Sequence, residues 1–107
     1  MPLQIDEGEI LERTMHDVRR AVRARVFGTV QGVSYRVWAR REAERLGVTG
    51  WVRNEGDGSV TALIAGTDTA VDAMIDRLWQ GPRGALVSAV ETEEVAEDAP
   101  ADFSIVA

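Results

Sequence analysis

The stretch VRARVFGTVQGVSYRVWARREAERLG, residues 22–47, changes its pattern of apolar residues twice. Apolar and polar side chains first alternate over residues 22–28, which is typical of a β-strand with one buried face. Two glycines then indicate a loop over residues 28–34. Apolar residues next recur at helical spacing over residues 35–46. The stretch therefore predicts a strand, a glycine loop and a helix in succession.

Both ends of this helix carry local signals. Ser34 is a residue type that commonly caps a helix N-terminus through its side chain, and we expect it to do so here. Gly47 is the residue type favoured just after a C-terminus. The apolar stripe between them consists of Tyr35, Trp38, Ala39, Ala43 and Leu46. We expect Trp38, and Trp79 further along the chain, to be packing residues.

The pattern continues with a predicted hairpin and a second helix. Residues 48–53 and 59–65 are predicted strands, and the turn residues 55–58 between them join the pair. Thr67 or Asp68 can cap the helix that follows. The apolar stripe of that helix consists of Val71, Met74, Ile75 and Leu78.

The end of the chain completes the predicted sheet. A Gly-Pro pair at 81–82 ends the second helix, residues 85–95 predict a fourth strand, and residues 103–106 predict a short C-terminal edge strand. Because each helix has one apolar stripe, we predict an α+β, ferredoxin-like βαββαβ two-layer sandwich with both helices on one face of an antiparallel sheet. Residues 19–107 form this domain, and residues 1–18 are predicted to be a mobile N-terminal extension.

The composition of the 107 residues excludes several kinds of chemistry. The absence of cysteine excludes a thiol nucleophile, disulfides, thiolate-bound zinc and iron–sulfur clusters. All 12 basic residues are arginine, so no lysine can form a Schiff base. The single histidine, His16, lies in the predicted extension, and we expect it to be solvated and not catalytic. The chain has no apolar run of about 18 residues. We expect a cytoplasmic protein without metal, cofactor or membrane partner.

The net charge of −6 is unevenly distributed. Residues 19–53 carry +7, whereas residues 54–107 carry −9 and residues 1–18 carry −4. One strongly basic segment in an acidic protein favours a local anion site over a long nucleic-acid surface. The composition is equally consistent with charges that pair across the surface after folding.

The loop from Gly28 to Arg36, with the sequence GTVQGVSYR, is the first candidate for chemistry. Successive amide groups in a glycine loop can converge on an anion, and the helix N-terminus adds unpaired donors. Arg36 would lie in the first helical turn, where a cation opposes the helix dipole unless an anion lies nearby. The alternative is an ordinary surface arginine after an ordinary turn. The loop is not a P-loop, because the Gly-Lys-Ser/Thr element is missing.

Asn54 is the second candidate, at the end of the segment GWVRN, residues 50–54. A neutral amide can accept a hydrogen bond from water through its oxygen and donate one to a developing oxyanion through its nitrogen. The alternative is that Asn54 only opens the turn, as asparagine commonly does.

Together the two stretches resemble the acylphosphatase family. Residues 28–36 match its signature Gly-x-Val-Gln-Gly-Val-x-Phe/Tyr-Arg in full. Residues 50–66 match its second pattern, Gly-aromatic-Val-Arg/Lys-Asn-x-x-x-Gly-x-Val followed by a glycine. The resemblance covers about residues 20–106, and two long motifs at family spacing make it specific.

The resemblance implies a metal-independent hydrolase that cleaves the carboxyl–phosphate bond of acyl phosphates to a carboxylate and inorganic phosphate. It implies that Arg36 binds the phosphate and that Asn54 orients the attacking water. It also implies that backbone amides cradle the phosphate oxygens, and these belong to Val30, Gln31, Gly32, Val33, Ser34, Tyr35 and Arg36. The residue inventory permits the reaction, because phosphoryl transfer from a good leaving group needs mainly positioning and electrostatics.

Two other interpretations stay open at this point. A non-catalytic ferredoxin-like module could bind RNA or another anion through arginines and Trp51, although the sheet lacks the aromatic-rich RNA-binding signature. An anion pocket could also serve sensing, or act on carbamoyl phosphate within a larger enzyme, since the family includes such fused domains. We expect a monomeric enzyme acting on a small acyl phosphate, with no nucleic-acid partner.

Overall fold

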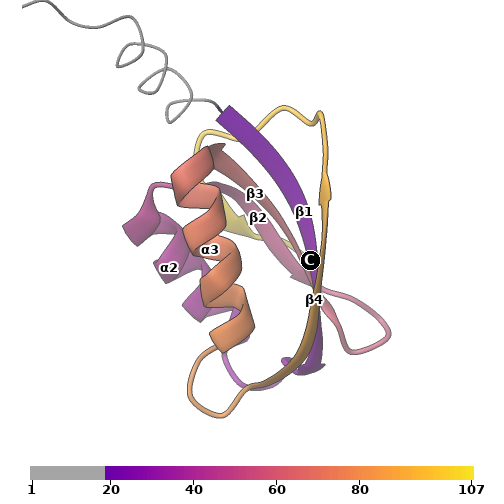
Figure 1. The fold of residues 1–107 in the computed structure, drawn as a ribbon. Helices are drawn as coiled ribbons and strands as arrows, with labels where there is room; N and C mark the ends of the chain where they lie inside the picture. The colour runs from indigo at the N-terminus through magenta and orange to yellow at the C-terminus, as the bar shows by residue number, and fades with distance from the viewer. Residues whose placement is uncertain (1–18) are drawn as a thin grey trace, which may run out of the picture.

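The structure, a computed structural model, describes residues 19–107. In chain order its elements are β1 (Arg19–Thr29), α2 (Tyr35–Leu46), β2 (Thr49–Asn54), β3 (Val60–Thr67), α3 (Asp68–Gln80), β4 (Leu86–Glu94) and β5 (Phe103–Ile105). The strands form one sheet in the order β4-β1-β3-β2-β5, and both helices cover the same face of it (Figure 1). The predicted ferredoxin-like α+β sandwich is confirmed. The predicted extension, with His16, lies outside the described residues. Neither helix within residues 19–107 is long and apolar enough to cross a membrane.

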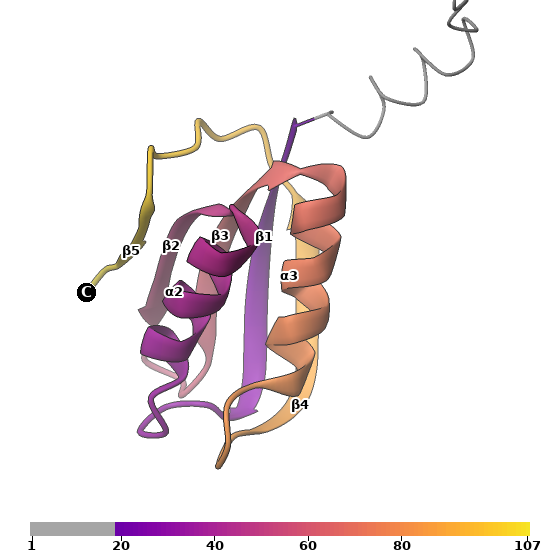
Figure 2. The same cartoon turned by 90° about the vertical axis from the view of Figure 1, so that its left-hand side faces the viewer.

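One strand departs from the predicted antiparallel sheet. The pairs β1·β3, β1·β4 and β2·β3 are antiparallel, whereas β5 pairs parallel to β2. After β4 the chain crosses the end of the sheet and reaches the opposite edge at the end where β2 begins (Figure 2). Because β5 starts from that same end, it runs in the direction of β2. The sheet is therefore mixed, and its last strand is an added edge.

The core lies between the sheet and the two helices. Strand β3 is buried along nearly its whole length, since it lies in the middle of the sheet. The buried residues of the helices are Tyr35, Ala39 and Ala43 on α2, and Val71, Met74 and Leu78 on α3. Small side chains on α2 allow its backbone to approach the sheet closely.

The two helical tryptophans differ in burial. Trp38 packs against the core, and its ring centroid lies 5.3 Å from that of Tyr35. The expectation that Trp79 is a packing residue is wrong, because 48% of it is exposed. Trp79 follows the buried Leu78 by one residue, and each residue turns about 100° around a helix. It therefore lies off the buried stripe of α3.

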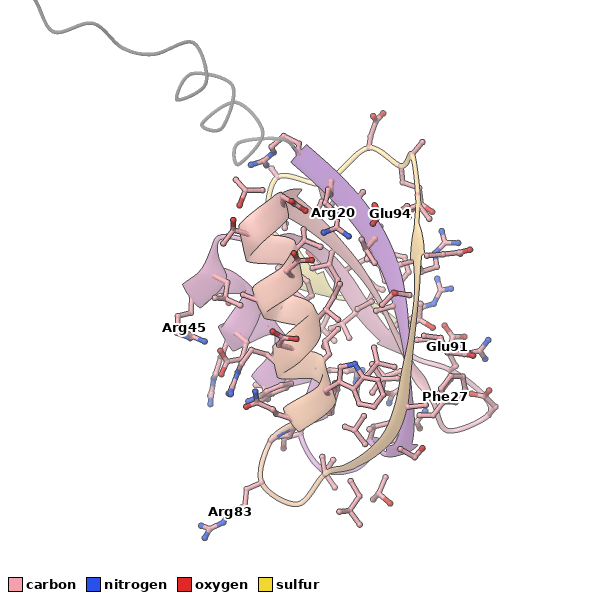
Figure 3. All side chains as sticks on the ribbon, viewed as in Figure 1. Arg20, Phe27, Arg45, Arg83, Glu91 and Glu94 are labelled. Atoms are coloured by element: carbon pink, nitrogen blue, oxygen red, sulfur yellow. The ribbon has the colours of Figure 1, made fainter. Side chains whose placement is uncertain are left out.

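Arg20 joins three elements of the domain. Its Nη1 donates to Asp68 at 2.7 Å and to Asp72 at 2.8 Å, both on α3, and its Nη2 donates to Glu94 on β4. Figure 3 shows Arg20 of β1 beside Glu94. The hydrogen bond to Glu94 contributes most to raising the pKa of the guanidinium above its ordinary value. One cation thus holds together three carboxylates that would otherwise repel one another.

Replacing Arg20 with methionine is expected to lower the free energy of unfolding by about 1–2 kcal/mol, because the three carboxylates lose their shared partner. The loss should shrink at high salt, which screens the remaining repulsion. Urea unfolding at low and high salt measures both effects. The matched control is Arg40→Met, which removes one exposed contact to Glu44 of 3.6 Å and should change stability very little. Equal losses in the two variants would contradict the assigned network.

Candidate active site

The pairing of β1 with β4 is irregular near the end of β1. The register shifts between Phe27 and Gly28, so that Gly28 pairs with Val87. Gly28 has φ +125°, and a Cβ at this position would lie 2.0 Å from the carbonyl oxygen of Leu86. Only glycine fits such a close approach of two backbones. The skipped residue is Ser88 of β4, and the pairing continues through Gly28 and Thr29 before the chain enters the loop before α2.

The loop before α2 contains two residues in the left-handed conformation. Gly32 has φ +76° and Ser34 has φ +59°, ψ +27°. Alternation of left-handed and right-handed residues turns successive amide groups toward a common point and forms an anion-binding concavity. A left-handed serine is strained, and such strain is typical of functional loops. The backbone geometry of the loop therefore suits a small anion.

The prediction that Ser34 caps α2 with its side chain is wrong. Ser34 occupies the N-cap position but makes no side-chain capping hydrogen bond. A serine cap normally has extended backbone geometry, whereas the backbone of Ser34 is left-handed. Thr67 shows the contrast, since it is extended and its hydroxyl accepts a hydrogen bond from the amide of Ala70 at 3.2 Å. Of the two candidates for the cap of α3, Thr67 is therefore the correct one.

Replacing Ser34 with glycine is expected to raise the free energy of unfolding by about 0.5 kcal/mol, because relief of the left-handed strain outweighs the greater chain entropy of glycine. Ser34→Val should lower it instead, since a β-branched side chain is poorly tolerated at positive φ. Urea unfolding of both variants measures these changes. A loss of stability on Ser34→Gly would mean that the serine side chain does stabilise the helix.

Tyr35 anchors the loop to the core. Its hydroxyl donates to the carbonyl oxygen of Leu78 on α3 at 2.7 Å, and the side chain is 1% exposed. Burial raises the pKa of this phenol, so it remains a neutral hydrogen-bond donor. Val30, at the start of the loop, is also buried. The loop is thus held at both ends by buried side chains.

Arg36 differs from the other arginines of residues 19–107. Seven arginines of this part of the chain form ion pairs with carboxylates, and Arg36 is not among them. Three more of the described arginines also lack a carboxylate partner, namely Arg19, Arg41 and Arg83, but all three are exposed. Arg36 is therefore the half-buried arginine without a counter-ion in the described part of the chain.

Asn54 lies at the end of β2, where it pairs with Val60 of β3. Its Oδ1 atom is buried and has no hydrogen-bond partner among the described residues. A buried amide oxygen without a donor is costly, so this atom is suited to accept a hydrogen bond from a bound water.

Arg36, Asn54 and the loop line one pocket of about 360 Å³. Its residues are Val30, Gln31, Gly32, Ser34, Tyr35, Arg36, Val37, Asn54 and Ile105. Of the predicted phosphate-binding residues, Val33 is absent from this lining and packs against the core. Val37 and Ile105 were not predicted. Ile105 reaches the pocket only because β5 pairs beside β2, which no local sequence signal indicates.

A second pocket, of about 450 Å³, lies on the open face of the sheet and is lined by Arg23, Arg25 and Arg53. Each of these guanidiniums already has a carboxylate partner, and that of Arg53 also lies 4.7 Å from the ring centre of Trp51. An anion would have to displace these carboxylates. The smaller pocket around Arg36 is therefore the better anion site, and the sheet-face arginines behave as paired surface charges.

The turn after Asn54 is held by charged side chains. The guanidinium of Arg53 donates to Glu55 at 2.6 Å and lowers the pKa of that carboxyl. The hydroxyl and amide of Ser59 donate to Asp57 and lower its pKa in the same way. Arg25 of β1 bonds Asp57 at 2.8 Å. The turn is thus tied to β1 and to the end of β2.

Comparison with known proteins identifies the family of this chain. The family model "Acylphosphatase" matches residues 22–105. The acylphosphatase of Mesorhizobium japonicum is 65% identical over 94 residues, which are 87% of this chain and 100% of that protein. That of Rhizobium etli is 63% identical over 92 residues, which are 85% of this chain and 98% of that protein.

Solved structures agree with this result. The structure of an acylphosphatase from Coxiella burnetii has a TM-score of 0.79 at 35% identity and covers 82% of this chain and 93% of its own. The acylphosphatase from Bacillus subtilis has a TM-score of 0.79 at 30% identity and covers 84% of this chain and 100% of its own. Nothing in these similarities favours the non-catalytic interpretation. The chain belongs to the acylphosphatase family and is an enzyme that hydrolyses the carboxyl–phosphate bond of acyl phosphates to a carboxylate and inorganic phosphate.

Proposed function

We propose that the substrate phosphate binds between the guanidinium of Arg36 and the backbone amides of residues 30–36. The observation that supports this most is the half-buried Arg36 without a carboxylate partner in residues 19–107. Partial burial of a charge is costly unless an opposite charge accompanies it. A planar guanidinium can bond two phosphate oxygens at once, and the left-handed loop geometry supplies further donors.

In the same proposal Asn54 orients the attacking water. Its orphaned Oδ1 accepts a hydrogen bond from that water, and its nitrogen can donate to a phosphate oxygen. The water oxygen forms a bond to phosphorus as the bond from phosphorus to the acyl oxygen breaks. The carboxylate leaves with the electron pair of that bond, and the proton of the water passes to the phosphate or to solvent. No strong acid is required, because a carboxylate is a good leaving group.

We further propose that this chemistry needs no metal ion. Phosphoryl transfer through a loose transition state is accelerated mainly by positioning and by fixed charges, which Arg36 and the loop amides supply. Release of phosphate from benzoyl phosphate in the presence of EDTA tests this directly. Undiminished turnover supports the proposal, whereas turnover that is lost with EDTA and restored by Mg²⁺ contradicts it.

The proposed enzyme is a cytoplasmic monomer with neither nucleic acid nor membrane as a partner. The charge of −9 over residues 54–107 opposes binding to a long polyanion or to an anionic membrane surface. Light scattering coupled to gel filtration measures the oligomeric state, and a mass near 11.7 kDa is expected. Salt-sensitive binding to RNA would contradict the absence of a nucleic-acid partner.

A further inference from the structure

The side chain of Gln31 joins the loop before α2 to the turn between β2 and β3. Its Nε2 donates to the carbonyl oxygen of Glu55 at 2.8 Å and to that of Ser59 at 2.9 Å. Both partners are acceptors, so only the amide nitrogen of Gln31 can face them. The two bonds connect residues that are 24 and 28 positions apart in the chain.

The two acceptors are the ends of the turn itself. The amide of Glu55 donates to the carbonyl oxygen of Ser59 at 2.8 Å, and the amide of Gly58 donates to that of Glu55 at 3.3 Å. The side chain of Gln31 therefore bonds both ends of a turn that is already closed by its own backbone hydrogen bonds. Asn54 directly precedes this turn, so a shift of the turn moves the backbone of Asn54.

The position of the Asn54 side-chain amide depends on the position of the Asn54 backbone. Its Oδ1 has no hydrogen-bond partner among the described residues, and its backbone lies at the last register position of the β2·β3 pair. The separation between its side-chain amide and the loop amides therefore depends on the β2·β3 pairing and on how the turn beside it is attached to the loop. The two bonds of Gln31 make such an attachment.

We propose that Gln31 is a positioning residue for the hydrolysis. It sets the distance between the loop amides, which hold the phosphate, and the side-chain amide of Asn54, which orients the water. The inference rests on the roles proposed above for the loop and for Asn54. Glutamine suits the task because a primary amide presents two donors without adding charge beside the bound phosphate. Glutamate would place acceptor oxygens against the two carbonyl oxygens, and asparagine is one methylene shorter.

The first test is Gln31→Met, which keeps the length of the side chain and removes both donors. We expect kcat for benzoyl phosphate to fall by about 10- to 100-fold, because a displacement of about 1 Å in a positioned group has an effect of this size. The inhibition constant of inorganic phosphate should change by less than about 3-fold, because a positioning defect acts in the transition state. A kcat within about 2-fold of the parental value would overturn the inference.

A double-mutant cycle with Asn54→Ala separates positioning from general damage. If Gln31 acts through Asn54, Gln31→Met should lower kcat little or not at all once Asn54 is alanine, since residues that act as a unit are not additive. An equal fall of kcat in both backgrounds would overturn the inference while leaving the role of Asn54 intact. Full activity of Asn54→Ala alone would instead remove the role proposed for Asn54.

Arg25→Met is the matched control, because Arg25 also bonds the turn, through Asp57 at 2.8 Å and the Ser59 hydroxyl at 3.1 Å, but from β1 and not from the loop. The kcat of Arg25→Met should stay within about 2-fold of the parental value. A fall as large as that of Gln31→Met would overturn the inference, because any loosening of the turn would then be enough to lower kcat. Thermal unfolding establishes that each variant is folded. Should Gln31→Met fail to fold, Gln31→Asn replaces it, with the same expectations.

Discussion

Replacement of Arg36 by alanine is expected to lower kcat/KM for benzoyl phosphate by about 10³-fold, because the substrate phosphate loses its positive counter-charge. Arg36 is half-buried, lines the pocket and has no carboxylate partner within residues 19–107, so its charge is available to a ligand. Binding of inorganic phosphate, measured by calorimetry, should weaken as well, since the ion pair exists in the ground state.

The free energy of unfolding of Arg36→Ala should rise, although its activity falls. The first turn of α2 contains no acidic residue, and Arg36 opposes the helix dipole there. Its removal should therefore raise the free energy of unfolding by a few tenths of a kcal/mol. A variant that is more stable and less active identifies Arg36 as a residue placed for binding and not for folding.

Two further variants sharpen the test of Arg36. Arg36→Lys keeps the charge and loses the planar pair of donors, so an intermediate loss of about 10- to 100-fold is expected. Arg41 belongs to the same helix and also forms no ion pair with the described residues, but it is exposed and outside the pocket. Arg41→Ala should leave kcat/KM unchanged within about 2-fold. Parental activity in folded Arg36→Ala would contradict the proposed phosphate site.

Replacement of Asn54 by alanine is expected to lower kcat by about 10²-fold or more while inorganic phosphate still binds. The physical reason is that the amide contacts the attacking water, whereas Arg36 and the loop hold the phosphate. Steady-state hydrolysis of benzoyl phosphate and calorimetric titration with phosphate separate the two effects. A phosphate affinity that falls as steeply as kcat would place Asn54 in phosphate binding and not in water positioning.

The control for Asn54 lies at the other end of the same strand. Thr49 also has a buried side-chain oxygen without a partner among the described residues, and it is not in the pocket. Thr49→Val preserves the shape of the side chain and removes that oxygen, so kcat should remain within about 2-fold of the parental value. Unchanged kcat in folded Asn54→Ala would contradict the proposed role.

Much of the fold could be predicted because its signals are local. Alternation over residues 22–28 and helical spacing over residues 35–46 predicted β1 and α2, and the turn residues 55–58 predicted the hairpin of β2 and β3. The failures concern the direction of β5, which pairs parallel to β2, and two single residues. Trp79 is apolar in a helix, yet its angular position leaves it exposed. Ser34 has a capping residue type, yet the loop holds its backbone in another conformation.

The site was predictable only in part, because some of its contacts join residues that are distant along the chain. The motif match pointed to the loop, Arg36 and Asn54, and the structure brings these residues to one pocket. Their catalytic roles stay a prediction until the variants are measured. The side-chain bonds of Gln31 and the presence of Ile105 in the pocket had no sequence signal, because both join segments that are distant along the chain.

By itself the sequence determined the order of strands and helices, the glycines that allow the loop to form, and the identity of the two motifs, since each depends on residues that are near one another in the chain. Only the tertiary structure decided that β5 adds to β2 in parallel and that Gln31 bonds the turn beside Asn54. It also decided that Arg36 lacks a counter-ion in residues 19–107, whereas the arginines on the sheet face have carboxylate partners. These features depend on which distant side chains meet when the sheet assembles. That outcome is governed by strand register and long-range packing, which no short window of sequence contains.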